Sequence, residues 1–295
     1  MKPTILAEGL TRRYGSTTAL DHVDFTLPSG RIVGLIGPNG AGKTTALKAI
    51  LGLTRFDGRL EVLGLDPSKK RDELMEDVCF IADVAVLPRW ARVHQVIDLT
   101  EKLHPRFSRE TCMHYLSRTK IKQKSKVRAL SKGMVVQLHL ALVMAIDAKL
   151  LVLDEPTLGL DILFRKQFYS SLLNEYFDEQ RTILITTHQV EEVEHILTDL
   201  IFIKDGKFIL HSTMDEVYER FTEVMIKPDQ IEQARALKPI HERTLFGRHI
   251  LLFDQADTGR LDELGEIHKP SVADLFVALM GEPEGRAEAV KEEAA

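Results

Sequence analysis

A glycine-rich run directly after a short apolar segment constrains the fold of this chain more than any other feature. The apolar segment is Ile32 to Ile36, and the run reads Gly37, Pro38, Asn39, Gly40, Ala41, Gly42, Lys43, Thr44, Thr45. It fits the G-x-x-x-x-G-K-[ST] pattern, and helix-favouring sequence follows it. A buried strand, a glycine loop and a helix in this order predict an α/β protein with the loop at the carboxyl edge of a parallel sheet.

The loop composition predicts a phosphate site. Glycines let backbone N–H groups turn inward around phosphate oxygens, and the N-terminus of the following helix adds partial positive charge. Lys43 is placed to hold the β and γ phosphates of a nucleoside triphosphate. The Thr44 hydroxyl is placed to ligate Mg²⁺.

A second apolar segment, Leu150 to Leu153, ends in two carboxylates that we expect at the same edge of the sheet. We predict that Asp154 binds Mg²⁺, usually through water, and that Glu155 orients the attacking water as a general base. A third segment, Thr182 to Thr186, is followed by His188, which is predicted to donate a hydrogen bond to the γ-phosphate.

Composition excludes several classes of protein. With 295 residues, 44% of them hydrophobic and 28% charged, the chain has the profile of a soluble globular protein. Lysine and arginine total 39 against 44 acidic residues, a net charge of -5, so no nucleic-acid partner is expected. Two cysteines fit a reducing cytoplasm, and no run approaches the roughly 20 apolar residues that span a bilayer.

The pattern along the chain predicts three parts. The first is an α/β domain over residues 1–210, with a fourth strand over Leu200 to Ile203 and a hairpin turn at Lys204 to Lys207. A helical subdomain is inserted over about 84–149. The second is a small α+β domain over 211–281, with strands near Val224 to Ile226 and His249 to Phe253. The third, 282–295, is predicted to be a disordered tail.

The last predicted helix lies in the small domain. Its first-turn signal is Ser271 with Asp274 three residues on, and Gly281 is predicted to end it. Its apolar face is expected to bury Val272, Leu275, Phe276 and Leu279.

Between Ile5 and Leu210 the chain resembles the ATP-binding subunits of ABC transporters. The segment that carries the resemblance is Leu130, Ser131, Lys132, Gly133 and Met134, a variant of the family's L-S-G-G-Q signature about 20 residues before Asp154. Gly159, Leu160 and Asp161 are similar to the family's D-loop. Tyr14 stands where the family stacks an aromatic ring on adenine.

The resemblance implies a P-loop NTPase core with a mainly parallel sheet, an antiparallel N-terminal β-subdomain and the inserted helical subdomain. It implies that Ser131 and Gly133 face the γ-phosphate of ATP bound by a second copy, so that MgATP holds a homodimer together. It also implies that hydrolysis drives a separate transmembrane permease, with this subunit peripheral on the inner face of the cell membrane.

Two departures from the family pattern bear on turnover. Lys132 and Met134 replace a glycine and the glutamine of the signature, and the resulting L-S-K-G-M is similar to exporter-type members. In the Q-loop the alignment puts Asp83 where the family has glutamine, so Asp83 would approach Mg²⁺ only through water or a loop shift. Gln95 is the alternative, although it falls in a helical pattern.

Two functions outside transport stay open at this point. The altered signature and Asp83 are compatible with a soluble regulatory nucleotide sensor of low turnover. A non-transport ATPase of the same family, acting on nucleic acid or the ribosome, is the other alternative. Trp90, the sole tryptophan, is interpreted as part of a permease-binding groove or as core packing.

Overall fold

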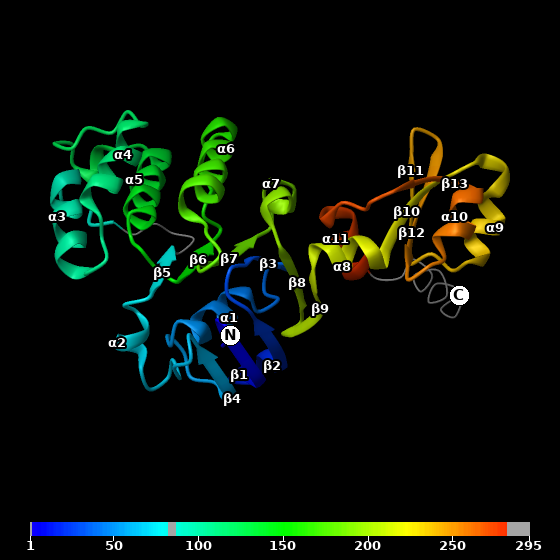
Figure 1. Cartoon of the computed structure of the whole chain (residues 1–295), viewed down its shortest axis with the longest axis horizontal. Helices are drawn as coiled ribbons and strands as arrows, with labels where there is room; N and C mark the ends of the chain where they lie inside the picture. The colour runs from blue at the N-terminus through cyan, green and yellow to red at the C-terminus, as the bar shows by residue number, and fades with distance from the viewer. Residues whose placement is uncertain (1, 82–86, 282–295) are drawn as a thin grey trace, which may run out of the picture. The chain divides into compact units, whose positions relative to one another are not determined.

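The structure is a computed structural model that describes residues 2–81 and 87–281. The chain divides into two compact units, the first ending at His211 and the second beginning at Ser212. Figure 1 shows their elements in chain order by colour. Among the described residues, no helix combines the length and the apolar character needed to cross a bilayer.

A six-stranded sheet forms the centre of the first unit, in the order β5-β6-β7-β3-β8-β9. Its strands are β3 (Ile32–Ile36), β5 (Val78–Ile81), β6 (Leu150–Asp154), β7 (Thr182–Thr187), β8 (Asp199–Lys204) and β9 (Lys207–Thr213). The first five strands in that order pair in parallel. The predicted parallel α/β core is therefore confirmed.

The central strands are buried along their whole length because both faces of the sheet are covered. Every residue of β3, β6 and β7 is buried. Strands of this kind show no polar alternation, which is the pattern expected of a parallel sheet. The turn between β8 and β9 lies at Asp205 and Gly206, both at positive φ, as the predicted hairpin requires.

A separate antiparallel sheet, β2-β1-β4, precedes and interrupts the parallel core. It consists of β1 (Ile5–Tyr14), β2 (Thr17–Leu27) and β4 (Asp57–Val62), and it is the β-subdomain that the family resemblance implies. Its inward side chains, among them Ile5, Leu10 and Leu20, share one hydrophobic core with helix α1 (Lys43–Ile50). That packing fixes the helix that follows the glycine loop.

The helices of the first unit fall into two groups. The core carries α1, α2 (Arg71–Leu74), α6 (Ile162–Ser171), the π-helical turn η2 (Leu172–Tyr176), α7 (Val190–Val193) and η3 (Glu194–Ile196). The inserted subdomain consists of α3 (Val93–Leu103), α4 (Arg109–Ser117), η1 (Val127–Ala129) and α5 (Lys132–Met144). This subdomain has a hydrophobic core of its own, built from residues such as Ile97, Leu116 and Leu138.

The second unit is α+β, with a four-stranded antiparallel sheet in the order β11-β12-β10-β13. Its elements are α8 (Met214–Arg220), β10 (Phe221–Ile226), η4 (Pro228–Gln230), α9 (Ile231–Ala236), β11 (His241–Leu245), β12 (Arg248–Asp254), α10 (Thr258–Leu264), β13 (Gly265–His268) and α11 (Val272–Met280). Val224, Leu251, Phe253 and Leu261 form its core.

The structure corrects several sequence expectations. Helix α11 begins and ends where predicted, with the Ser271 Oγ accepting the Asp274 N–H, but only Val272 and Leu275 of its apolar face are fully buried. Phe276 and Leu279 are half-buried instead, because the short helix is covered on one side only. Strands β5, β11 and β13 are further elements that the strand signals missed, each being only four or five residues long.

Candidate active site

A pocket of about 230 Å³ lies where the glycine loop meets the carboxyl end of β6. Its lining residues are Ala19, Asn39, Gly40, Gly42, Lys43, Thr44, Thr45, Asp154 and Glu155. All of these except Ala19 are among the site residues predicted from the sequence. The fold brings them together because β3 and β6 end at the same edge of one parallel sheet.

Lys43 is the only cation among the lining residues of this pocket, and it is almost fully buried. Its Nζ donates to the Gly37 carbonyl at 2.6 Å and to the Pro38 carbonyl at 3.2 Å. Burial lowers the pKa of this ammonium, and the nearby charges of Glu155 and Asp154 act in the opposite direction. A buried ammonium held beside a loop of backbone N–H groups is suited to bind phosphate oxygens.

Gly42, the residue before α1, shows why the loop requires glycine. Its φ is +113°, and a Cβ atom built there would lie 2.4 Å from the Ala19 carbonyl oxygen. Any other residue would therefore suffer both backbone strain and a clash with β2. The Ala41 carbonyl accepts a hydrogen bond from the Gly206 N–H at 2.9 Å, which ties the loop to the hairpin turn after β8.

Asp154 is buried at the end of β6 and has one partner that sequence reasoning missed. The Thr186 hydroxyl on the neighbouring strand β7 donates to its Oδ1. Register explains the pairing, because Asp154 and Thr186 are directly opposite in the parallel ladder. The only sequence signal was the threonine at the predicted end of the strand.

Glu155 adopts an unusual backbone conformation for a non-glycine residue, with φ of 48°. Its N–H donates to the Thr186 carbonyl at 3.0 Å, which holds this turn. Its Oε1 lies 2.8 Å from Nδ1 of His188, whose side chain is about half exposed. The imidazole therefore contacts the carboxylate predicted to act as the base, and its Nε2 has no partner among residues 2–81 and 87–281. Positive φ at a non-glycine residue is the kind of local strain that functional sites retain.

Arg165 of α6 is a second residue that sequence reasoning missed. Its Nε donates to the Leu160 carbonyl at 2.9 Å, and its Nη1 donates to the Gln189 amide oxygen at 2.8 Å and pairs with Glu192. One guanidinium thus joins the D-loop to the segment after His188. No short sequence pattern signals this contact, since Gln189 and Glu192 are 24 and 27 residues away from Arg165 along the chain.

The signature residues lie outside the phosphate pocket. Ser131 is the N-cap of α5, where its Oγ accepts the Met134 N–H at 3.2 Å, and Asp161 is the N-cap of α6. A Cβ atom placed on Gly133 would come within 3.6 Å of the Gly159 carbonyl oxygen, so the signature lies beside the D-loop of its own chain. None of Ser131, Gly133 and Asp161 lines the pocket that contains Lys43.

Tyr14, the predicted adenine-stacking residue, is 43% exposed at the end of β1. The Arg12 guanidinium lies 4.3 Å from the centre of its ring and covers one face. Hydrogen bonding to Thr54, with a further contribution from Arg12, lowers the pKa of the Tyr14 hydroxyl. Tyr14 is not one of the residues that line the phosphate pocket.

The two Q-loop alternatives have different outcomes. Asp83 lies outside the described residues, so its role as a metal ligand stays a prediction. Gln95 lies in the first turn of α3, where its amide oxygen accepts the Arg92 N–H at 2.8 Å as part of a capping box. That contact gives Gln95 a structural role.

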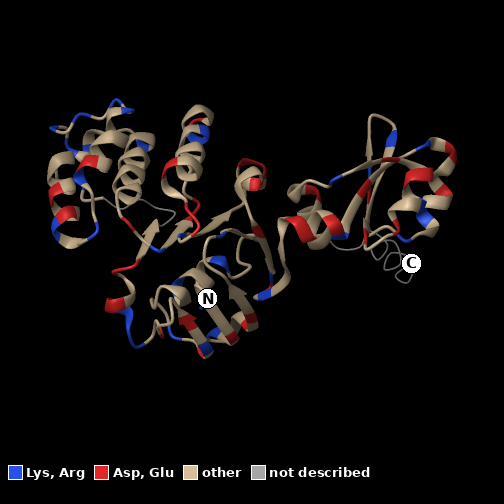
Figure 2. Ribbon diagram, viewed as in Figure 1, with Lys and Arg blue, Asp and Glu red and all other residues tan. Residues whose placement is uncertain are grey.

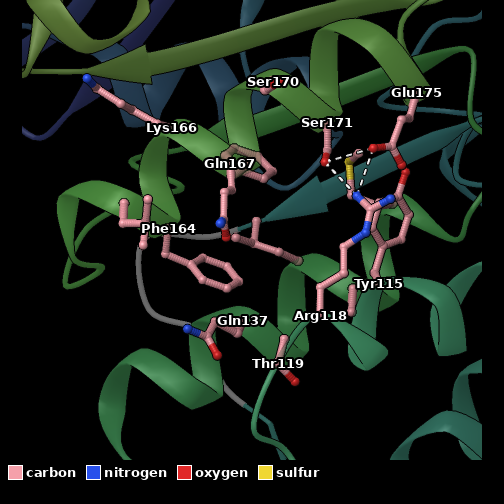
Figure 3. A pocket seen from close by; sticks show the side chains of 15 residues that line it. Tyr115, Arg118, Thr119, Gln137, Phe164, Lys166, Gln167, Ser170, Ser171 and Glu175 are labelled. Atoms are coloured by element: carbon pink, nitrogen blue, oxygen red, sulfur yellow. Dashed lines mark hydrogen bonds and ion pairs between the residues drawn. The ribbon is translucent and has the colours of Figure 1, made fainter.

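A larger pocket of about 510 Å³ lies between α4, α5 and α6. Figure 3 shows Arg118 at one side of it, joined to Ser171 and Glu175, with Phe164 on the other side. Apolar atoms make up most of its lining surface, and its one arginine is already paired with a carboxylate. Phosphate binding is better supported in the smaller pocket, which combines the glycine loop, an ammonium and two carboxylates.

Comparison with known proteins agrees with this assignment. The family model for "ABC transporter" matches residues 20–158. The "Nod factor export ATP-binding protein I" of Ralstonia nicotianae is 31% identical over 310 aligned positions, covering 95% of this chain and 94% of that protein. The "Daunorubicin resistance ATP-binding protein DrrA3" of Streptomyces coeruleorubidus is 28% identical, covering 94% and 96%.

A solved structure described as "Structure of ATP binding subunit of ABC transporter" has the same fold, with a TM-score of 0.66 at 24% identity. The aligned region covers 73% of this chain and 92% of the chain in that structure. Because similarity to the Ralstonia protein extends over nearly the full length of both chains, this chain belongs to the ATP-binding subunits of ABC transporters, which are ATPases.

Proposed function

We propose that this subunit dimerises on MgATP and powers a separate transmembrane permease, as an exporter, from the inner face of the cell membrane. The proposal of a dimer rests on the position of Ser131. Within one chain Ser131 caps α5 and does not line the pocket that contains Lys43. A phosphate pocket that is open on one side needs a second copy to supply its missing donors, and two identical copies can form two equivalent sites. The name of the Ralstonia relative, a Nod factor export protein, supports the direction of transport.

We propose Glu155 as the general base and His188 as the residue that contacts the γ-phosphate. The pair is already hydrogen-bonded at 2.8 Å, so the imidazole orients the carboxylate toward one position. The Glu155 side chain is largely buried, which limits the water that reaches it from the solvent. Ser131, Gly133 and Asp161 are assigned to the partner copy's nucleotide, and Tyr14 to the adenine of its own.

The chain also offers the ligands that Mg²⁺ prefers. Thr44 provides a hydroxyl and Asp154 a carboxylate, and both line the same pocket. We assign the ion to these two residues, with Asp83 as the third predicted contributor. Bound there, Mg²⁺ would neutralise charge on the β and γ phosphates. The buried Thr186 hydroxyl fits this role, because it fixes Asp154 with one oxygen free for the ion.

Replacing Thr186 with valine is expected to lower ATPase activity at limiting Mg²⁺ by roughly 10- to 100-fold, because Asp154 loses the donor that orients it. The measurement is the Mg²⁺ dependence of the ATPase rate. Thr182→Val is the matched control, since its hydroxyl on the same strand pairs with Thr4 at 3.0 Å, outside the residues that line the pocket. Equal Mg²⁺ dependence in both variants would remove Thr186 from the site.

The transport role is tested in membrane vesicles that contain this chain and the membrane protein encoded beside it. We expect ATP-dependent export that is lost in both Lys43→Ala and Glu155→Gln. Export that survives in Glu155→Gln would contradict the proposed chemistry. If the purified protein and its Glu155→Gln variant hydrolyse ATP at equal rates, the result would favour the regulatory nucleotide sensor over the transporter subunit. Co-purification with DNA or ribosomes instead of a permease would favour the non-transport alternative.

A further inference from the structure

One segment of this acidic protein is strongly basic. The chain as a whole has a net charge of -5, yet no acidic residue occurs between Glu110 and Asp147. The same stretch contains seven basic residues: Arg118, Lys120, Lys122, Lys124, Lys126, Arg128 and Lys132. Figure 2 shows this cationic run along the connection between α4 and α5. The net charge therefore conceals a local positive surface.

Packing turns most of these cations outward. Residues between them, Ile121 and Val127, pack on the hydrophobic core of the helical subdomain. Lys120, Lys122 and Lys124 are exposed on the intervening positions. The alternation of anchored and charged residues fixes the backbone and leaves the ammonium groups in solvent.

A second segment brings two arginines and the sole tryptophan to the same place. The Arg128 N–H donates to the Arg89 carbonyl at 3.1 Å, and the Val127 N–H donates to the Ala91 carbonyl at 2.9 Å. The Arg92 Nη1 also donates to the Lys124 carbonyl at 2.5 Å. These bonds hold the segment around Trp90 against the basic loop.

We call seven of the basic residues in these two segments the basic surface. They are Arg89, Arg92, Lys120, Lys122, Lys124, Lys126 and Arg128. Within residues 2–81 and 87–281, none of the seven forms an ion pair, whereas the nearby Arg118 pairs with Glu175 at 2.8 Å. Trp90 lies in sequence between Arg89 and Arg92 and is 76% exposed, which excludes the core-packing role.

We propose that the basic surface and Trp90 bind the anionic lipid surface of the membrane. Clusters of four to eight Lys and Arg residues attract anionic headgroups. Tryptophan favours the membrane–water interface because its ring is amphipathic. An unpaired cluster with one exposed indole offers both. A sequence-tolerant nucleic-acid site would instead use several stacked aromatic rings, and only Trp90 accompanies these cations. Neither Trp90 nor the seven cations line the two pockets of this unit described above.

This inference rests on the proposed function only in placing the subunit at a membrane, and its test needs neither permease nor ATP. Trp90 is the single tryptophan, so the intrinsic tryptophan emission of the full chain reports on it alone. We expect a blue shift with phosphatidylcholine vesicles that contain phosphatidylglycerol, and no shift with phosphatidylcholine alone. Lipids brominated in the acyl chain should quench the emission. Raising salt from about 0.15 M to about 1 M should reverse the binding.

Neutralising four cations at once provides the mutational test. Lys120, Lys122, Lys124 and Arg128 changed to glutamine should weaken vesicle binding by about fivefold per charge, and so by at least a hundredfold together. The matched control changes four exposed lysines elsewhere, Lys69, Lys70, Lys207 and Lys238, to glutamine, with the same change in net charge. Control binding should stay within about twofold. Vesicle sedimentation measures both, and also Trp90→Ala, for which about a tenfold loss is expected.

Three results would overturn the proposal. The first is an unchanged emission spectrum with anionic vesicles. The second is equal weakening in the two four-residue variants, which would reduce the effect to net charge. The third is a larger shift with polyglutamate or a single-stranded RNA than with vesicles, which would assign the basic surface to an acidic protein segment or to nucleic acid. Normal ATPase activity in these variants would separate each failure from a failure of the ATPase assignment.

Discussion

Glu155→Gln is expected to lower the turnover of ATP by about 10²- to 10⁴-fold while ATP still binds. Glutamine has nearly the same shape as glutamate, so the turn at φ 48° and the N–H bond to the Thr186 carbonyl should persist. What disappears is the basicity that activates water and the negative charge that His188 contacts at 2.8 Å. Binding depends on the glycine loop and Lys43, which the substitution leaves in place.

Single-turnover hydrolysis and equilibrium binding of ATP by the purified variant separate these two effects. Glu179→Gln is the control, because it makes the same chemical change at an exposed position before β7 and should keep full activity. A variant that loses binding and hydrolysis together would show that Glu155 holds the fold of the loop. A variant with normal turnover would remove Glu155 as the base.

Lys43→Ala should abolish detectable hydrolysis by weakening ATP binding at least about 10²-fold. The pocket has nine lining residues, of which one is a cation and two are carboxylates, so the variant would present only negative charge to the triphosphate. Loss of a charged hydrogen-bond donor alone costs about 1.5 to 3 kcal/mol, and repulsion by Asp154 and Glu155 adds to it. The buried position makes this loss larger than at the surface.

Isothermal titration with a slowly hydrolysed ATP analogue measures the effect. Lys48→Ala is the matched control on the same helix, because Lys48 is an exposed lysine and not one of the residues that line the pocket. It should bind the analogue as the unsubstituted protein does. A thermal melt of Lys43→Ala close to that of the control would show that the carbonyls released at Gly37 and Pro38 do not unfold the loop. Equal affinity in both variants would contradict the assignment.

Local pattern was sufficient to predict the central elements of the fold. Strand β3, the glycine loop and α1 combine a buried apolar run, positive φ at Gly42 and an amphipathic helix, all encoded within about 20 residues. The carboxyl ends of β3 and β6 then meet because parallel strands share an edge. That rule was enough to predict that Lys43 and Asp154 would meet, although more than 100 residues separate them.

The contacts that were missed depend on register and tertiary packing. Thr186 reaches Asp154 because β7 pairs with β6 at one particular register, which no single strand specifies. Arg165 of α6 links Leu160 to Gln189 through its guanidinium, whereas a lone arginine in a helix predicts an exposed charge. The short strand β11 was missed because its five residues include three charged or imidazole side chains.

The burial of both native cysteines makes a cross-linking test of the proposed dimer site possible. Cys79 and Cys112 are buried, and burial raises the pKa of each thiol to about 12. Thiols in this state are unreactive near neutral pH, so an introduced cysteine can be labelled without removing either of them. Asn39 and Ser131 are both exposed in the single chain, so a cysteine introduced at either position can be reached by a cross-linker.

The decisive measurement is the yield of covalent dimer when Asn39→Cys and Ser131→Cys proteins are mixed with a short bismaleimide cross-linker. Both proteins also carry Glu155→Gln. The dimer account predicts a covalent pair in the mixture with MgATP, little without nucleotide, and none from a mixture in which the Asn39→Cys protein also carries Lys43→Ala. Each cysteine variant alone should give no pair, because the two positions come from different copies. A mixture that yields no covalent dimer with MgATP, or the same yield without it, would contradict a shared site completed by Ser131.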